Sequence, residues 1–125
     1  MQKPSILLVD DNDIDILIAK KYLEMSDFFS AIHTAGDGED ALKIVKKVQP
    51  NYVLLDINMP ILDGWGFLDL FEMPSNKKTI QPKIIMLTSS ISEKDEERAL
   101  NNPHVSHFLV KPINSVKIKQ FLENH

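Results

Sequence analysis

Short apolar runs alternate along this chain with longer segments that carry apolar residues at helical spacing. The runs have the length and the β-branched content of strands buried on both faces. Strict alternation of this kind predicts a parallel sheet with helices on both of its faces, a three-layer α/β domain. The expected strands are residues 6–9, 30–34, 52–55, 84–87 and 108–110, and the expected helices are residues 14–25, 41–48, 67–71, 92–100 and 116–122.

Residues that start and stop helices support this division of the chain. Asn12 or Asp13 can cap the first helix, and Pro50 closes the second. Ser90 is followed three residues later by Glu93, a spacing that resembles a capping box for the fourth helix.

Polar side chains stand directly after four of the five expected strands. Because the carboxyl ends of parallel strands share one edge of an open sheet, these side chains are expected to gather where such folds bind ligands. Three carboxylates, two hydroxyls and one ammonium group are brought there. The residues are Asp10, Asp11, Asp56, Thr88, Ser89 and Lys111.

This combination of groups suits a phosphoryl group beside a divalent cation. Crowded carboxylates repel one another, and Mg²⁺ relieves that repulsion while keeping sites for water and phosphate oxygens. Lys111 supplies a second positive charge, and Thr88 and Ser89 can donate hydrogen bonds to phosphate oxygens. With no serine or cysteine nucleophile paired to a base, a carboxylate is the expected acceptor, which gives an aspartyl phosphate.

Each of these residues also has an ordinary structural interpretation. Asp10 and Asp11 could cap the following helix, Asp56 could be a turn residue, and Lys111 before Pro112 could be incidental. Taken one at a time, these simpler interpretations are favoured. The placement of all of them at strand ends, with matching chemistry, favours a site.

Length and charge restrict the class of protein further. The chain has 125 residues, which fits one domain over residues 1–125 without a separate output domain. It has no cysteine and a net charge of −4, which excludes disulfides and thiolate metal sites and argues mildly against binding nucleic acid. No apolar run is long enough to span a membrane and no secretion signal is visible, so a cytoplasmic location is expected.

The sequence resembles the CheY-like receiver domains of bacterial two-component response regulators. The matching segments occur in the order of that family and extend from about Ser5 to Leu122. They read Leu8-Val9-Asp10-Asp11, Ala35-Gly36-Asp37-Gly38-Glu39-Asp40-Ala41-Leu42, Leu55-Asp56-Ile57-Asn58-Met59-Pro60, Asp63-Gly64, Leu87-Thr88-Ser89 and Val110-Lys111-Pro112.

The resemblance implies a flavodoxin-like (βα)₅ fold with strand order 2-1-3-4-5. It implies that Asp56 accepts a phosphoryl group from a histidine kinase or a histidine phosphotransfer protein. Asp10, Asp11, Asp56 and the backbone carbonyl of Asn58 would hold Mg²⁺, or another divalent cation such as Mn²⁺.

The same resemblance assigns the remaining contacts of the phosphoryl group. Thr88 and Lys111 would bind it, together with the backbone amides of Asn58 and Ser89. Phe108 stands at the family's aromatic switch position, where many members have tyrosine. Without a hydroxyl group, its response to Thr88 would have to work through burial of the ring.

The expected role is that of a switch and not of a turnover enzyme, acting as a single-domain regulator on an unknown downstream protein. Its output face would comprise residues 92–100, 106–110 and 114–122. It would interact with neither nucleic acid nor membrane, and it would be a monomer or a phosphorylation-dependent dimer.

Two other functions share part of this pattern. A small Mg²⁺-dependent phosphatase that passes through an aspartyl phosphate normally has an acid two residues after its nucleophile, where this chain has Asn58. A flavin or nucleotide carrier of the same fold class would have a glycine- or serine-rich loop after the first strand, where residues 10–13 are acidic or amide side chains.

Overall fold

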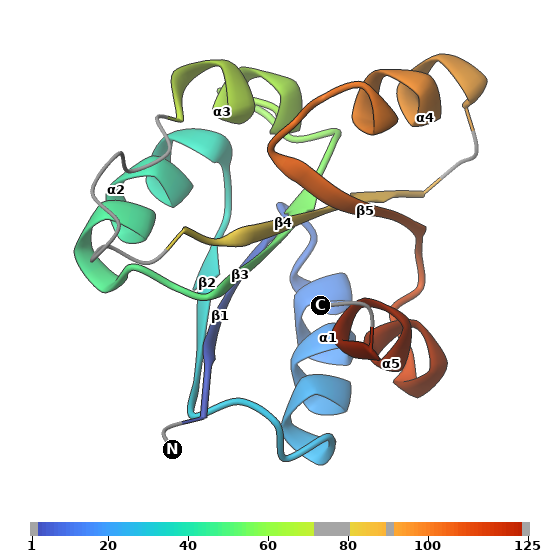
Figure 1. Ribbon diagram of the computed structural model, residues 1–125. Helices are drawn as coiled ribbons and strands as arrows, with labels where there is room; N and C mark the ends of the chain where they lie inside the picture. The colour runs from blue at the N-terminus through green and yellow to red at the C-terminus, as the bar shows by residue number, and fades with distance from the viewer. Residues whose placement is uncertain (1–2, 72–80, 90–91, 124–125) are drawn as a thin grey trace.

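Five β-strands and five α-helices alternate along the computed structural model, which describes residues 3–71, 81–89 and 92–123 (Figure 1). The alternation agrees with the order expected from the apolar runs. The strands are β1 (Ser5–Val9), β2 (Ala31–Ala35), β3 (Tyr52–Asp56), β4 (Lys83–Thr88) and β5 (Val105–Val110); the helices are α1 (Asp13–Met25), α2 (Gly38–Val48), α3 (Gly64–Leu70), α4 (Glu93–Leu100) and α5 (Ser115–Glu123).

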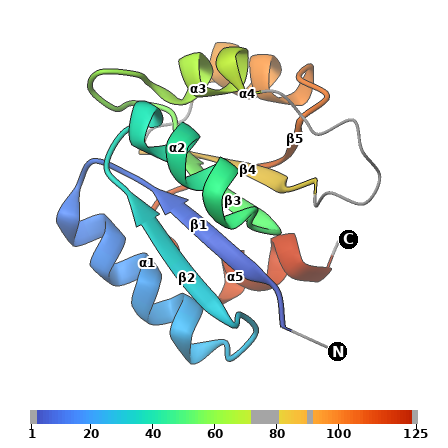
Figure 2. The same ribbon diagram turned by 90° about the vertical axis from the view of Figure 1, so that its left-hand side faces the viewer.

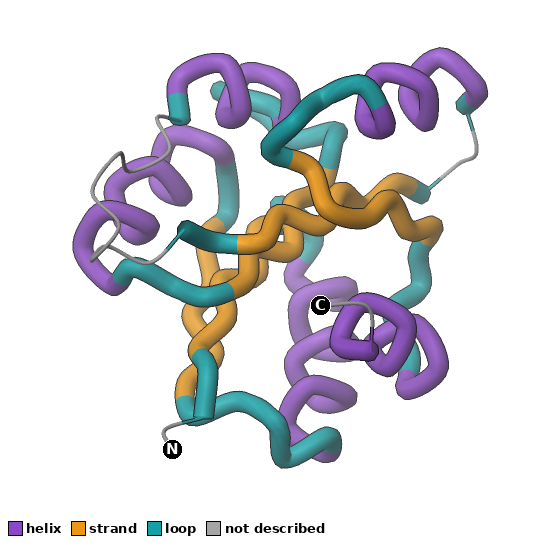
Figure 3. Tube along the Cα trace, in the orientation of Figure 1, coloured by secondary structure: helices purple, strands orange, loops and turns teal. Residues whose placement is uncertain are grey.

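The strands form one parallel sheet in the order β2-β1-β3-β4-β5. Helices α1 and α5 cover one face, and α2, α3 and α4 cover the other (Figures 1 and 2). The predicted three-layer fold and strand order are therefore confirmed. Because all five strands run the same way, their carboxyl ends lie along one edge. Figure 3 shows the strands, in orange, between the helices of the two faces.

Burial on both faces explains why the central strands are continuously apolar. In β1, Leu7 and Val9 pack into the cluster under α2, α3 and α4, whereas Ile6 and Leu8 pack into the cluster under α1 and α5. Successive side chains of a strand point to opposite faces, so a strand covered on both sides needs apolar residues at every position. All five residues of β3 are buried in the same way.

Side-chain caps fix where the helices begin at the carboxyl edge of the sheet. The Asn12 side chain accepts hydrogen bonds from the backbone N–H groups of Ile14 and Asp15, both at 3.0 Å. Helix α4 is capped by Ser92, which accepts from the N–H of Asp95 at 3.3 Å. The predicted capping box is therefore wrong by two residues, and Ser90 itself lies outside the described residues.

Three elements start three residues earlier than their apolar residues indicate. Helices α2 and α3 begin at Gly38 and Gly64, before the expected starts at residues 41 and 67, because Asp37 and Asp63 cap them there. Strand β5 is an edge strand and only partly buried, so its first half did not have to be continuously apolar. No helix within the described ranges combines the length and apolar character needed to cross a bilayer.

Candidate functional site

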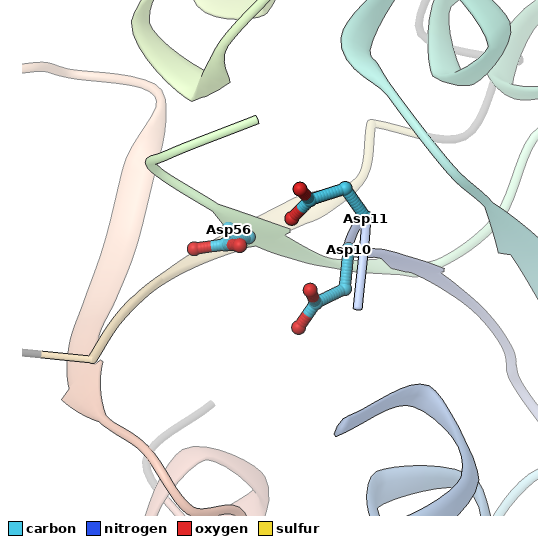
Figure 4. Close-up of side chains that lie close together, drawn as sticks. All are labelled: Asp10, Asp11 and Asp56. Atoms are coloured by element: carbon cyan, nitrogen blue, oxygen red, sulfur yellow. The ribbon is translucent and has the colours of Figure 1, made fainter. Parts of the chain in front are cut away.

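The polar residues at the strand ends meet at the carboxyl edge of the sheet. Asp10 and Asp11 follow β1, Asp56 ends β3, Thr88 ends β4, and Lys111 follows β5. Figure 4 shows the three aspartates gathered between the ends of β1 and β3. The strand order brings β1 beside β3 and β3 beside β4, so residues far apart in the sequence are neighbours here.

The three aspartates form a cluster that can hold a cation. Each offers one carboxylate oxygen, and these oxygens lie within 4.8 Å of one another. Asp10 and Asp56 are buried, with 2% and 4% of their surface exposed, whereas Asp11 is open to solvent. Hard oxygen ligands with one open side fit Mg²⁺ or Mn²⁺, which keep water or phosphate oxygens in their remaining positions.

Backbone groups hold the two buried carboxylates in place. The N–H of Asn12 donates to Asp10 Oδ1 at 2.9 Å, and the N–H of Asn58 lies 3.4 Å from Asp56 Oδ1. Gly64 packs directly behind Asp56, since a Cβ atom at this position would lie 2.6 Å from the Asp56 carbonyl oxygen. The site is thus fixed both by strand β3 and by the start of helix α3.

Lys111 reaches into the acidic cluster from the end of β5. Its Nζ atom lies 2.5 Å from Asp10 Oδ2, 3.0 Å from Asp15 Oδ2 and 3.3 Å from Asp56 Oδ2. Its backbone N–H donates to the carbonyl of Thr88 at 2.7 Å, and the Lys111–Pro112 peptide bond is cis. One ammonium group therefore faces three carboxylates and offsets only part of their charge.

Burial and charge shift the pKa values of both partners. Burial raises the pKa of Asp56 from 3.8 to about 6; Lys111 opposes this increase and Asp10 adds to it. For Lys111, burial alone would lower the pKa, but hydrogen bonds with Asp10 and Asp15 and the charges of Asp10 and Asp56 raise it above its usual value. At neutral pH, Lys111 is charged and Asp56 is mostly ionised, but more basic than a surface aspartate.

The other predicted phosphate contacts lie around this cluster. Thr88 is buried at the end of β4, and Ser89 and Asn58 are exposed beside it in the loops that follow β4 and β3. Phe108 is partly buried against the core cluster under α2, α3 and α4, opposite Met86 in the β4–β5 register. Their roles in binding phosphate or in switching stay predictions.

Asp15 is the site residue that sequence reasoning missed. It pairs with Lys111 across 96 positions of sequence, in the first turn of α1. One signal could have found it: α1 starts directly after Asp10 and Asp11, so its first turn lies at the same edge of the sheet. The pairing itself depends on the tertiary structure, which brings the first turn of α1 to the residue that follows β5, and no local pattern records this.

Known proteins match this chain over nearly its whole length. Residues 6–123 match the family described as the response regulator receiver domain. A probable methanogenesis regulatory protein FilR2 of Methanothrix harundinacea is 31% identical over 94% of this chain and 78% of its own length. A protein-glutamate methylesterase/protein-glutamine glutaminase of Methanococcus maripaludis is 30% identical over 94% of this chain, which spans only 31% of that relative.

Solved structures agree with this assignment. The chemotaxis response regulator CheY4 of Vibrio cholerae has a TM-score of 0.77 and 27% identity, covering 98% of both chains. A two component response regulator from Cytophaga hutchinsonii has a TM-score of 0.87 with 23% identity, covering 98% of this chain and 96% of its own, and supports the fold alone. By its fold, its matched residues and these relatives, this chain belongs to the response regulator receiver domains, the phosphoacceptor modules of two-component signalling.

Proposed function

We propose that this chain is a phosphorylation-controlled switch in which Asp56 accepts a phosphoryl group from the phosphohistidine of a histidine kinase or a histidine phosphotransfer protein. One observation carries the proposal. Asp56 is a buried carboxylate whose ligand oxygen lies within 4.8 Å of those of Asp10 and Asp11, with the ammonium group of Lys111 3.3 Å away. A nucleophile, a place for a cation and a fixed positive charge thus coincide.

The acidic cluster is the proposed Mg²⁺ site, and Mn²⁺ would fit the same ligands. Asp10, Asp11 and Asp56 would supply carboxylate oxygens, and the backbone carbonyl of Asn58 would supply the fourth protein ligand. A bound cation would neutralise the crowded carboxylates and the charge that develops on the phosphoryl oxygens. The partly exposed position of this cluster leaves room for the donor's phosphoryl group on the side of Asp11.

The chain's own residues carry out the transfer. An oxygen of the ionised Asp56 attacks phosphorus, a new P–O bond forms, and the P–N bond of the phosphohistidine breaks with its electron pair left on the imidazole nitrogen. Lys111 then donates to a phosphoryl oxygen, as do the hydroxyl of Thr88 and the backbone amides of Asn58 and Ser89. Catalysis of this kind consists of positioning and charge stabilisation.

We further propose that the donor docks across the start of α1. Ile14, Leu17 and Ile18 are exposed apolar side chains on the first half of this helix, directly after the acidic residues. A donor histidine must approach Asp56 from the carboxyl edge of the sheet, so the donor's surface has to cover this region. Apolar side chains there would provide the contact area that acidic groups do not.

The proposed output face consists of α4, β5 and α5. Strand β5 is one of the two edge strands of the described sheet, and α4 and α5 lie on either side of it (Figure 1). Leu100 of α4 and Val116 of α5 are exposed apolar side chains that a target could cover. Lys111 directly follows β5. A phosphoryl group that attracts Lys111 and Thr88 would therefore move the end of a strand that belongs to this face.

We propose a switch rather than a phosphatase with steady turnover. Asn58 stands two residues after Asp56, where a phosphatase of this type needs an acid, and an amide cannot transfer a proton in that role. Continuous hydrolysis of p-nitrophenyl phosphate would contradict this. Because a histidine kinase takes the phosphoryl group that it passes on from ATP, we place the protein in the cytoplasm.

Intact-mass spectrometry after incubation with acetyl phosphate and Mg²⁺ tests the acceptor directly. Wild-type protein is expected to gain one phosphoryl group, and the gain should be absent in EDTA and in the Asp56→Asn variant. The absence of an adduct with acetyl phosphate and with every phosphohistidine donor tried would contradict the proposal. An adduct that persists in Asp56→Asn would move the acceptor elsewhere.

A further inference from the structure

We propose that Asp15 is a positioning residue: it holds the ammonium group of Lys111 while Asp56 is unphosphorylated and competes with the phosphoryl group for it. Asp15 would thereby set how tightly the site binds a phosphoryl anion. The inference rests on the proposed function of Asp56 and adds a residue to it. It begins from the contact of 3.0 Å between Lys111 Nζ and Asp15 Oδ2, which is shorter than the 3.3 Å to Asp56.

The first argument is the number of partners that one ammonium group can have. A lysine ammonium has three N–H donors, and Lys111 already faces the three carboxylates of Asp10, Asp15 and Asp56. Phosphorylation turns the carboxylate of Asp56 into an acyl phosphate, so the phosphoryl oxygens then compete for Lys111 with the carboxylates of Asp10 and Asp15. The strength of the new contact depends on which carboxylate is released and at what cost.

Burial selects Asp15 as the partner that is released. Its side chain is 39% exposed, whereas that of Asp10 is 3% exposed and that of Asp56 is 6% exposed. A released Asp15 can be solvated by water, but a buried carboxylate without its cationic partner carries a large desolvation penalty. Asp10 and Asp56 are also the residues that a cation would bind.

A divalent cation in the acidic cluster would increase the share of Asp15 in holding Lys111. Asp10 and Asp56 belong to the acidic cluster, and a cation there would take up part of their charge. The carboxylate of Asp15 pairs with Lys111 and is not one of the three clustered carboxylates, so it would keep its full charge opposite Lys111 when a cation is bound. The competition that precedes phosphoryl binding is then mainly between Asp15 and the phosphoryl oxygens.

The side chain of Asp15 can be changed without dismantling helix α1. The helix is capped by Asn12, which bonds to the backbone N–H of Asp15 and not to its carboxylate. The helix packs on the sheet through Ala19 and Leu23, which are buried one to two turns later. Asp15→Asn therefore keeps the cap and the packing while removing the charge that faces Lys111.

The test is a titration with beryllofluoride in the presence of Mg²⁺, followed by ¹⁹F NMR. Asp15→Asn is expected to bind this phosphoryl mimic about threefold to fivefold more tightly than wild type, the change that an ion pair of this exposure supports. Asp15→Glu, which keeps a carboxylate, should stay within about twofold of wild type. Asp13→Asn removes a charge from the same helical turn outside the Lys111 ion pairs and should also stay within about twofold.

A double-mutant cycle with Lys111→Met distinguishes action through Lys111 from a general charge effect. In that background, Asp15→Asn should alter the affinity by less than about twofold, because the group that it acts through is gone. Without any metal or mimic, NMR of the lysine side chains in EDTA should show a shifted Lys111 signal in Asp15→Asn, with the other lysines unchanged.

The outcomes separate this inference from the proposed function. If wild-type protein binds no beryllofluoride, or Asp56→Asn binds it equally well, the proposed function is wrong and this inference is overturned with it. If binding requires Asp56 but Asp15→Asn equals wild type, equals Asp13→Asn, or keeps its effect in Lys111→Met, only the role of Asp15 is overturned.

Discussion

The carboxyl group of Asp56 lies where burial and the neighbouring Asp10 oppose its ionisation and Lys111 favours it. Because its pKa is about 6 in the folded protein and near 3.8 in the unfolded chain, only the folded state holds the proton between these values. Stability is therefore lost as the pH rises through this window, and the loss levels off above pH 6. Ionisation of Asp56 at neutral pH therefore lowers the free energy of unfolding of the metal-free protein.

Replacing Asp56 with asparagine should remove that loss. In EDTA at pH 8, we expect Asp56→Asn to raise the free energy of unfolding by about 1–3 kcal/mol, and at pH 5 by about half as much. Lys111 keeps Asp10 and Asp15 as partners in this variant, so no unpaired buried cation results. Urea unfolding at the two pH values measures the difference, and equal stability of both proteins at pH 8 would contradict the raised pKa.

The same pKa predicts how cation binding depends on pH. A proton on Asp56 removes one of the three carboxylate ligands, so the proton and Mg²⁺ compete for the site. The affinity for Mg²⁺ should be constant above about pH 6.5 and fall up to about tenfold per pH unit below pH 6. Calorimetric titration from pH 5 to pH 8 tests this, and an affinity that falls only below pH 4 would assign Asp56 an ordinary pKa.

At the scale of the elements, the start of α3 is packed against the end of β3 with no space for a side chain. A Cβ atom on Gly64 would lie 2.6 Å from the Asp56 carbonyl oxygen and 3.0 Å from Ile57 Cα. Both are backbone atoms, so Gly64→Ala must displace the strand end that carries the acceptor. We expect a loss of about 2–4 kcal/mol of stability and at least tenfold slower phosphorylation by acetyl phosphate.

Gly36→Ala is the matched control for this substitution. A Cβ atom on Gly36 would meet nothing within 4 Å, and its backbone has no positive φ that would favour glycine. It should change stability by less than about 0.5 kcal/mol and leave phosphorylation unchanged. Thermal unfolding and intact-mass spectrometry provide both measurements, and similar behaviour of the two variants would show that α3 does not position Asp56.

Helix α1 carries the exposed apolar side chains of the proposed docking surface. Leu17→Ser should slow phosphotransfer from phosphohistidine donors about tenfold, because it removes an apolar contact from the proposed docking surface. Its reaction with acetyl phosphate, which needs no protein contact, should be unchanged. Leu100→Ser is the control, since Leu100 is about as exposed as Leu17 but belongs to α4. Transfer that is slowed equally in both variants would exclude α1 as the docking helix.

Particular elements show what the sequence could and could not predict. Strand β1 was clear because burial on both faces requires four consecutive apolar residues, whereas the first half of β5 was missed because Ser106 is exposed and Val105 and His107 are only partly buried on the edge strand. The acidic cluster could be predicted, since the carboxyl ends of parallel strands lie along one edge of the sheet. The Asp15–Lys111 pair depends on tertiary packing and left no local pattern.

At the scale of the whole molecule, the site and the proposed output face are joined through β4 and β5. Thr88 pairs with Val110 and Met86 with Phe108, and Phe108 packs against the same core cluster as Trp65. Side chains two positions apart in a strand share a face, so Thr88 points to the side on which Phe108 lies. A movement of Thr88 toward a phosphoryl group would open space on that side.

This arrangement predicts a measurable response of the Phe108 ring. Addition of beryllofluoride and Mg²⁺ should shift its NMR signals, as the ring follows Thr88 inward. The fluorescence of Trp65, whose ring lies 4.3 Å from the guanidinium of Arg98 on α4, should change at the same concentrations. Thr88→Ala should bind the mimic yet lose the Phe108 response. An unchanged ring environment in wild-type protein would exclude Phe108 as a switch.

The order of the site residues along the chain determines when during synthesis the site becomes complete. Asp10 and Asp56 emerge from the ribosome well before Lys111, and Lys111 follows an edge strand that pairs only with β4 in the described sheet. A nascent or prematurely terminated chain that lacks β5 has the acidic groups without the lysine that offsets their charge. Under the proposed function, competence for phosphorylation would therefore be acquired last, and an incomplete chain would not compete with the finished protein for phosphoryl groups.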